Sequence, residues 1–304
     1  MKELKSANIK KFIPVYALLL PAVASTLIFH YIPLFGLITA FKEYDIFKGF
    51  WYSPWAEQHG FKYIIEIFTM KSLRDSIGNT LMLSVLGMVI GFPAPIILAL
   101  LINELKNGFF KKFIQTVSYM PHFLSWMSVI GLTMIFFSEY GPINDLLNIF
   151  SPERARQLYL AKQQNFVPML LGLGLWKGIG FSSIVYIATI SSIDPQLYEA
   201  AMIDGAGRLR QTWHITIPSL TVIMVLLLVL SLGGLLNSNF ELVFGLRSPF
   251  INFETIDTII YSNGLLRRGY SMATALGLVR GIIAMSLTLG ANWLSKKING
   301  LSII

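Results

Sequence analysis

The chain contains no cysteine, and charged residues make up only 13% of its 304 residues. The lack of cysteine excludes disulfide bonds, thiolate catalysis and cysteine metal ligands. So few charges cannot cover the surface of an ordinary soluble protein of this length. Because 54% of the residues are hydrophobic, the composition instead indicates an all-α protein that crosses a membrane several times.

Several catalytic motifs are also missing. There is no G-x-x-x-x-G-K-[ST] phosphate-binding loop, no H-E-x-x-H pair and no G-x-S-x-G elbow. Gly172, Gly174 and Gly178 resemble a glycine-rich loop, but they lie in an apolar run and are better explained as packing residues. We therefore expect no catalytic residue, no metal site and no cofactor bound by this chain.

The net charge of +8 comes from basic residues in small groups beside apolar segments. Nucleic-acid binding requires a basic patch or stripe, which this distribution does not provide. Groups of this kind are typical of residues that set membrane topology. We expect lipid around the chain and no nucleic-acid partner.

Six apolar segments have the roughly 20 residues that a membrane-spanning helix needs. They cover about residues 12–41, 77–102, 113–137, 166–190, 215–240 and 272–294. The first is far longer than the roughly 7 to 15 apolar residues of a signal peptide. The sequence thus predicts one transmembrane domain over residues 1–304, with six helices.

The charges in the short connections predict an orientation. If both termini are cytoplasmic, the inner segments hold eleven basic and five acidic residues, with Lys2 and Lys5 among the basic ones. The outer loops hold eleven of each sign over nearly twice the length. The positive-inside rule therefore favours cytoplasmic termini, and it places the connection before the fifth segment in the cytoplasm.

That connection contains the segment EAAMIDGAGRLRQTWHITIP, residues 199–218. Asp194 followed by Pro195 is a good helix start, and Gly205 is well placed to end the helix with a positive φ. These signals predict a short amphipathic helix outside the membrane, within residues 194–212. By themselves they also fit an ordinary connection with good caps.

The same segment resembles the EAA signature of binding-protein-dependent ABC importer permeases. Glu199-Ala200-Ala201, Gly205, Ile215 and Pro218 match its spacing, and Ile217 stands where leucine is favoured. Further matches resemble the LplB-like branch of carbohydrate permeases, and they are Tyr31-Ile32-Pro33, Gly36, Ala40-Phe41, Asn79-Thr80, Asn103-Glu104, Pro121-His122-Phe123, Ser125-Trp126, Gly141-Pro142-Ile143-Asn144 and Trp176-Lys177.

This resemblance implies a type I importer in a bacterial cytoplasmic membrane. Its parts would be two related permeases, two ATPase subunits that bind ATP and magnesium, and an extracytoplasmic solute-binding protein. The cargo would be an oligosaccharide or a polysaccharide fragment. In the coupling helix, Glu199 would contact the ATPase, Ala200 and Ala201 would allow its close approach, and Gly205 would form the turn. Asp204 and Pro218 complete the expected coupling residues.

Two charged residues lie at membrane depth. Lys177 is about 11 residues into the fourth segment, or roughly 16 Å deep, and Arg280 is about 8 residues into the sixth, or roughly 12 Å deep. Such residues are candidates for a solute pathway, although snorkelling or contact with a second permease would explain them equally well. The other pathway candidates are the third-segment residues Tyr119, His122 and Trp126, the fourth-segment Trp176, and the fifth-segment Asn237 and Asn239.

A self-contained secondary sugar transporter is the main alternative, because intramembrane charges and kinked helices are expected there too. An intramembrane enzyme is a more distant one. The EAA segment distinguishes them, since a transporter without an ATPase has no use for it. Loops 44–55, 141–162 and 247–270 are candidates for contact with a solute-binding protein by position.

Overall fold

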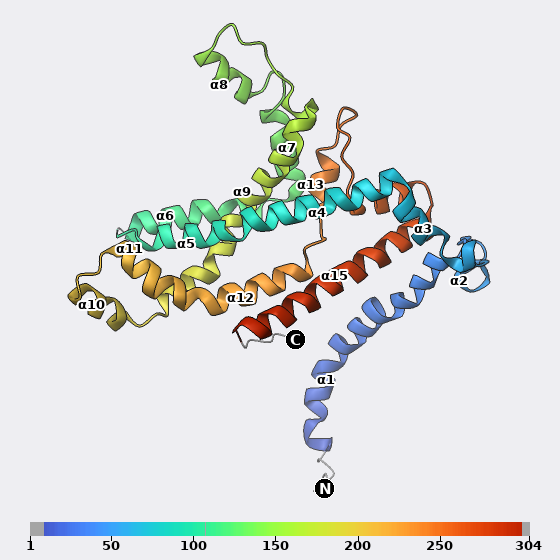
Figure 1. The fold of residues 1–304 in the computed structure, drawn as a ribbon, viewed down its shortest axis with the longest axis horizontal. Helices are drawn as coiled ribbons and strands as arrows, with labels where there is room; N and C mark the ends of the chain where they lie inside the picture. Colours follow the sequence, from blue (N-terminus) through green and yellow to red (C-terminus); the bar gives the residue numbers. More distant parts are fainter. Residues whose placement is uncertain (1–8, 107, 300–304) are drawn as a thin grey trace. The chain divides into compact units, whose positions relative to one another are not determined.

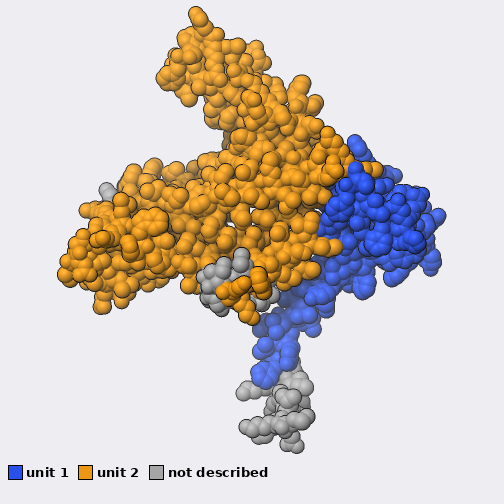
Figure 2. Space-filling view, in the orientation of Figure 1, with its two compact units in different colours: residues 1–69, 260–279 blue, residues 70–259, 280–304 orange. Residues whose placement is uncertain are grey.

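The computed structural model describes residues 9–106 and 108–299, and Lys2 and Lys5 lie outside these ranges. The described residues are mostly helical (Figure 1), and their only β-type pairing is an isolated bridge between Lys42 and Trp55. Packing divides the chain into two compact units, coloured in Figure 2. Unit 1 comprises residues 1–69 and 260–279, and unit 2 comprises residues 70–259 and 280–304.

Unit 1 begins with a long helix that changes type along its length. Its parts are α1 (Ile9–Thr26), a π-helix (Leu27–Tyr31) and a 3-10 helix (Ile32–Phe41). Pro21 lies inside α1 and Pro33 near the start of the 3-10 part. Because proline has no N–H to donate, it interrupts the regular α-helical hydrogen bonds at such points.

The rest of unit 1 is built from short helices. They are α2 (Gly49–Tyr52), a 3-10 helix (Gln58–Gly60), α3 (Lys62–Thr69), a π-helix (Ile260–Leu266) and the start of α15 (Tyr270–Asn299). Lys42 is buried, and its Nζ donates to the backbone oxygens of Phe50 and Trp51 at 2.8 and 2.9 Å. Lys62 is half-buried, and its hydrogen bond to Glu43 and the charges of Glu57 and Glu43 raise its pKa.

Unit 2 contains most of the long helices. They are α4 (Lys71–Gly91), α5 (Pro93–Asn103), α9 (Gln163–Ser191), α12 (Ile217–Gly233) and the remainder of α15. Ala99, Tyr186, Ile190 and Leu220 form one buried cluster between α5, α9 and α12. A second cluster joins α7 (Trp126–Phe136), α9 and α13 (Phe240–Gly245) through Ile130, Phe166 and Val243.

Five segments of the described residues are long and apolar enough to cross a membrane. They are Pro14–Phe41, Lys71–Asn103, Gln163–Ser191, Arg208–Gly233 and Tyr270–Trp293. A sixth is present if α6 with its 3-10 extension (Gly108–Phe123) and α7, which are bent by 100° from each other, count as one span. The all-α, multi-pass fold is thereby confirmed.

The third predicted segment, 113–137, is therefore not one continuous helix. The 3-10 helix Met120–Phe123 ends at Leu124, and Ser125 starts α7 by accepting a hydrogen bond from Ser128 N at 3.1 Å. Both Leu124 and Ser125 have extended backbone angles. A side-chain cap inside an apolar run starts a new helix in another direction.

The fifth predicted segment, 215–240, also differs from the structure. The helix begins at α11 (Arg208–Gln211), continues through a π-helix (Thr212–Thr216) and ends at Gly233, where a second glycine follows. Two consecutive glycines favour a helix end because neither restricts the backbone to helical angles. Asn237 and Asn239 consequently lie in the connection after the helix, rather than on it.

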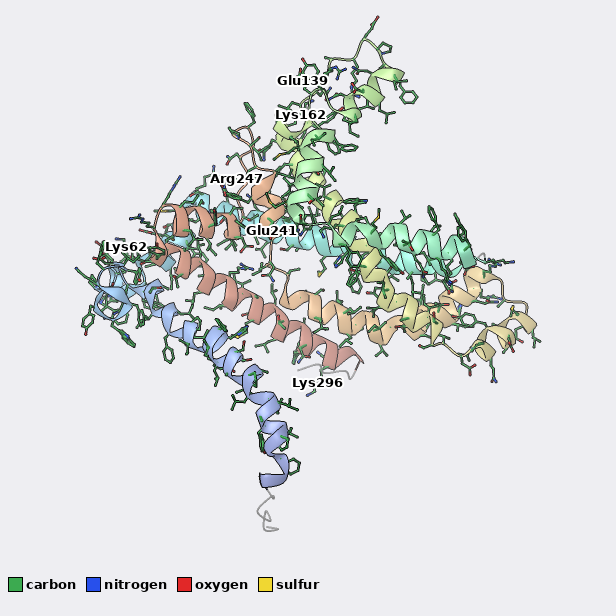
Figure 3. The ribbon with its side chains drawn as sticks, turned by 180° about the vertical axis from the view of Figure 1, so that it is seen from behind. Lys62, Glu139, Lys162, Glu241, Arg247 and Lys296 are labelled. Atoms are coloured by element: carbon green, nitrogen blue, oxygen red, sulfur yellow. The ribbon has the colours of Figure 1, made fainter. Side chains whose placement is uncertain are left out.

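Residues 139–162 form an arm of unit 2 that carries α8 (Pro142–Phe150). Glu139 and Lys162, the first and last residues of this arm, are labelled in Figure 3. The buried Asn144 organises the arm, because Nδ2 donates to the backbone oxygens of Ser138 and Gln157, each at 2.9 Å. Unit 2 also contains a short 3-10 helix (Tyr159–Ala161), α10 (Pro195–Ile203) and the short α14 (Ile256–Ile259).

Candidate coupling helix and membrane cavity

The EAA segment forms α10 (Pro195–Ile203), a helix of nine residues. Asp194 is its N-cap and accepts a hydrogen bond from Gln196 N at 2.9 Å. Pro195 occupies the first helical turn, where its missing N–H has no intrahelical partner to lose. The predicted helix start is confirmed.

The end of α10 depends on Gly205, whose φ is +74°. Ala206 N donates to Ala201 O at 2.8 Å, and Gly205 N donates to Met202 O at 3.1 Å. This pair of bonds is the Schellman arrangement, which requires a residue in the left-handed region. Glycine adopts that conformation without the steric cost of a Cβ, and the predicted positive φ is confirmed.

The surface of α10 is largely uncovered by the rest of the described chain. Glu199, Ala200 and Asp204 are exposed and Ala201 is half-buried. The apolar side chain of Ile203 is 87% exposed, and those of Leu197 and Met202 are also exposed. An apolar and acidic helix face of this kind is available for contact with another protein.

Three side-chain contacts anchor this region to the helices beside it. Tyr198 Oη and Thr216 Oγ1 are 2.9 Å apart, which links α10 to the π-helix that directly precedes α12 in the chain. Gln211 Nε2 donates to Ala206 O at 2.8 Å, and Arg208 forms an ion pair with Glu104 at 3.1 Å. Pro218, the last residue of the motif, is exposed in the first turn of α12. These contacts join α10 to the π-helix before α12, and they join α11 to the end of α5.

A cavity of about 650 Å³ lies among α4, α5, α9, α12 and α13 of unit 2. Most of its lining is apolar, with residues such as Leu83, Leu171 and Leu227. Asn237 and Asn239, two of the predicted pathway residues, also line it. Asn239 Oδ1 is used to cap α13, because it accepts a hydrogen bond from Leu242 N at 3.3 Å.

Lys177 does not line this cavity but contacts the break between α6 and α7. Its Nζ donates to His122 O at 2.6 Å and lies 5.2 Å from the centre of the Trp126 ring. The 3-10 helix that contains His122 ends at the next residue, Phe123, so this carbonyl has no helical N–H to accept from. The buried ammonium group therefore satisfies the end of one helix, which also favours a positive charge.

Two of the other predicted residues, His122 and Tyr119, lie beside the same break. The His122 ring stacks on Phe181 with 3.9 Å between ring centres, and Tyr119 lies in the last turn of α6 (Gly108–Tyr119). Trp176 is exposed. Among the described residues that line the cavity, none of these predicted aromatic positions occurs.

Arg280 is paired with an acidic residue that the sequence did not single out. Its Nη1 donates to Asp257 Oδ1 and its Nη2 to Asn237 Oδ1. Asp257 Oδ2 also accepts from Ser238 Oγ at 2.6 Å. In the sequence, Asp257 is one of two acids in the predicted outer loop 247–270, which does not indicate a partner inside the membrane. Among the described residues, no three His, Asp or Glu side chains come together as a metal site would require.

Comparisons with known proteins identify the family. Residues 91–300 match the family described as "Binding-protein-dependent transport system inner membrane component". The chain is 39% identical over 286 residues to Protein LplB of Bacillus subtilis (strain 168), which covers 93% of this chain and 88% of the relative. It is 40% identical over 285 residues to the polygalacturonan/rhamnogalacturonan transport system permease protein YteP of the same organism, with 93% and 87% covered.

Solved structures agree with these relatives. A chain of a bacterial ABC transporter involved in the import of the acidic polysaccharide alginate has a TM-score of 0.88 and 38% identity, with 96% of this chain and 98% of that chain covered. A chain of a bacterial alginate ABC transporter in complex with alginate pentasaccharide-bound periplasmic protein has the same TM-score and 37% identity, with 97% and 98% covered. This chain therefore belongs to the family of binding-protein-dependent transport system inner membrane components, which are the multi-pass permeases of ABC importers.

Proposed function

We propose that this permease moves an oligosaccharide or a polysaccharide fragment into the cytoplasm, driven by ATP hydrolysis in separate subunits. The observation that carries the proposal is the exposed face of α10, which is rigidly capped at both ends and anchored to α12. A well-ordered helix with an uncovered apolar face fits a docking element better than a simple connection.

The exposed face of α10 and the segment around it contain the residues that we propose couple the permease to the ATPase. Glu199 would contact a cationic group of the ATPase at the rim, because a carboxylate there fixes the register of two surfaces. Ala200 and Ala201 are small enough to allow close approach of the partner. Gly205 holds the helix end, and Asp204 and Pro218 lie at the two sides of the same cytoplasmic segment.

The substrate class follows from the relatives. One is named for polygalacturonan and rhamnogalacturonan transport, and others are named for arabinooligosaccharide and galactooligosaccharide transport. The solved transporter imports alginate, an acidic polysaccharide. The common feature is a chain of sugars, so we propose that this cavity passes an oligosaccharide, with Asn237 and Asn239 as its polar contacts.

The partners would be a second permease, two ATPase subunits that bind ATP and magnesium, and an extracytoplasmic solute-binding protein. This arrangement requires α10 in the cytoplasm and both chain termini on that side of a bacterial cell membrane. The loops 44–55, 141–162 and 247–270 would then face the solute-binding protein. The distribution of basic residues supports this orientation.

Reconstitution of the complete transporter in liposomes tests the proposal. The expected result is ATP-dependent uptake of a labelled sugar only when the solute-binding protein, the second permease and the ATPase are all present. Alginate oligosaccharides, oligogalacturonate, arabinotriose and galactotriose, screened against the solute-binding protein, would identify the cargo. If the chain recruits neither ATPase nor second permease and instead carries sugar down an ion gradient, it is a secondary transporter and the proposal is wrong.

A further inference from the structure

Asp257 joins three segments of unit 2. Its two carboxylate oxygens accept from Ser238 and from Arg280, which lie in the connection after α12 and in α15. The side chain of Asp257 is 13% exposed and that of Arg280 is 23% exposed. Charges this poorly hydrated are stable only when they are paired and hydrogen-bonded, and here each satisfies the other.

Arg280 in turn fixes the orientation of Asn237. A guanidinium group can only donate, so the amide of Asn237 must turn its Oδ1 toward Arg280 Nη2 and its Nδ2 away. Nδ2 then lies beside Gly234, another residue that lines the cavity. No atom of the described residues accepts a hydrogen bond from Nδ2, so its two N–H groups are open to the contents of the cavity.

The ion pair therefore determines whether the Asn237 side chain presents its N–H donors or its oxygen to the cavity. Sugar hydroxyl, ring and carboxylate oxygens all accept hydrogen bonds, and two amide N–H groups suit any of them. Without Arg280 the amide is free to rotate and to present its oxygen instead. Asp257 limits the guanidinium to one position, and through Ser238 it also holds the backbone beside Asn237.

We propose that Asp257 and Arg280 are positioning residues that hold the amide donors of Asn237 toward sugar in the cavity. The inference rests on the proposed function, because it assumes that sugar passes through this cavity. Asp257 orients Arg280, Arg280 orients Asn237, and Asn237 alone of the three contacts the sugar.

The test uses the reconstituted transporter and its solute-binding protein loaded with galactotriose or oligogalacturonate, whichever that protein takes. The readout is sugar uptake per ATP hydrolysed, since a loss of folded transporter lowers both rates together and leaves the ratio unchanged. We expect Asn237→Ala to lower this ratio about 2- to 10-fold, the value of one hydrogen bond. Asp257→Asn should lower it in the same range. The control Lys62→Met, which removes an ion pair to Glu43 outside the cavity, should leave it unchanged.

The double variant Asn237→Ala/Asp257→Asn decides whether Asp257 acts through Asn237. Residues that act through one another are not additive, so the double variant should be no worse than Asn237→Ala alone. A multiplied loss would overturn the positioning role, and an unchanged ratio in Asn237→Ala would overturn the contact itself. If Asp257→Asn does not accumulate, Arg280→Lys is used in its place. It keeps the charge but cannot bridge both partners in the same way.

The variant Asn237→Asp shows whether the sugar group that contacts residue 237 is a hydroxyl or a carboxylate. A sugar hydroxyl can donate to the new carboxylate, which would restore part of the lost ratio, whereas a uronate carboxylate would be repelled and the ratio would fall below that of Asn237→Ala. Either result supports the contact between residue 237 and the sugar, and a ratio equal to the wild type would contradict it. If the wild-type transporter shows no ATP-dependent uptake, the proposed function itself has failed, which is a different outcome from any of these.

Discussion

Replacement of Gly205 tests whether the end of α10 couples the permease to its motor. A Cβ at this position would meet no atom within 4 Å among the described residues beyond its chain neighbours, so a larger residue causes no clash with them. The positive φ of +74° is the only local demand on it. The effect of a substitution is therefore backbone strain alone, unless another protein lies against the residue.

That strain can be estimated. A residue with a Cβ in the left-handed region costs about 1–2 kcal/mol relative to glycine, which shifts the equilibrium of the helix end about 5- to 30-fold toward other conformations. Asparagine tolerates this region much better than alanine or valine. We expect Gly205→Val to leave the protein inserted in the membrane and to lower sugar uptake per ATP hydrolysed, while Gly205→Asn keeps most of the coupling.

The assay is uptake and ATP hydrolysis in the reconstituted transporter, with Gly207→Ala as the matched control. Gly207 also has open space around it, but its φ of −67° suits any residue. Coupling that is lost equally in Gly205→Asn and Gly205→Val would show that bulk at the interface matters rather than φ. Normal uptake by Gly205→Val would refute the role of this helix end altogether.

Two further substitutions test the packing of unit 2 by thermal unfolding in detergent. Gly180→Ala would place a Cβ against the backbone carbonyl of Ser118, so we expect destabilisation of at least about 1–3 kcal/mol. Gly178→Ala, with open space, should change little, and equal stability of the two variants would contradict the close helix contact. Lys177→Met removes the donor to His122 O and should cost about 1.5–3 kcal/mol, the value of a hydrogen bond to a charged group. An unchanged unfolding midpoint would show that Lys177 does not hold the break.

The helix around the EAA motif could be predicted because its determinants are local. Asp194, Pro195 and Gly205 act through backbone groups within a few residues, so their types and spacing are sufficient. The apolar segments could also be predicted from the sequence, since a bilayer sets a minimum length for each. These features depend on neighbouring residues in the sequence and on the thickness of the bilayer, and not on the packing of distant helices.

The break in the third span was harder to predict because both of its helices are apolar. Hydropathy averages over a window and gives no direction, although Pro121 and Ser125 were signals of a boundary. The early end of the fifth span had a clearer signal in Gly233 and Gly234. Their effect was outweighed by the apolar residues on either side.

The polar contacts inside the membrane depend on tertiary structure. Lys177 was predicted to lie at membrane depth, but its partner is a backbone carbonyl, and no residue type marks such a group in a sequence. Arg280 was a candidate for the solute pathway, with snorkelling or contact with a second permease as alternatives, and its partner Asp257 is 23 positions away in a segment assigned to an outer loop. Hydropathy identifies charges that need a partner, but it does not identify the partner.

The central claim is that the uncovered face of α10 contacts an ATPase. Because the chain has no cysteine, Ile203→Cys provides a single thiol on this face, which can be labelled with a maleimide-benzophenone probe and irradiated in the assembled transporter. We expect a photo-crosslink from residue 203 to the ATPase, and none from a matched thiol at the exposed Phe150 of the α8 arm. A crosslink from position 150 and none from position 203 would contradict it.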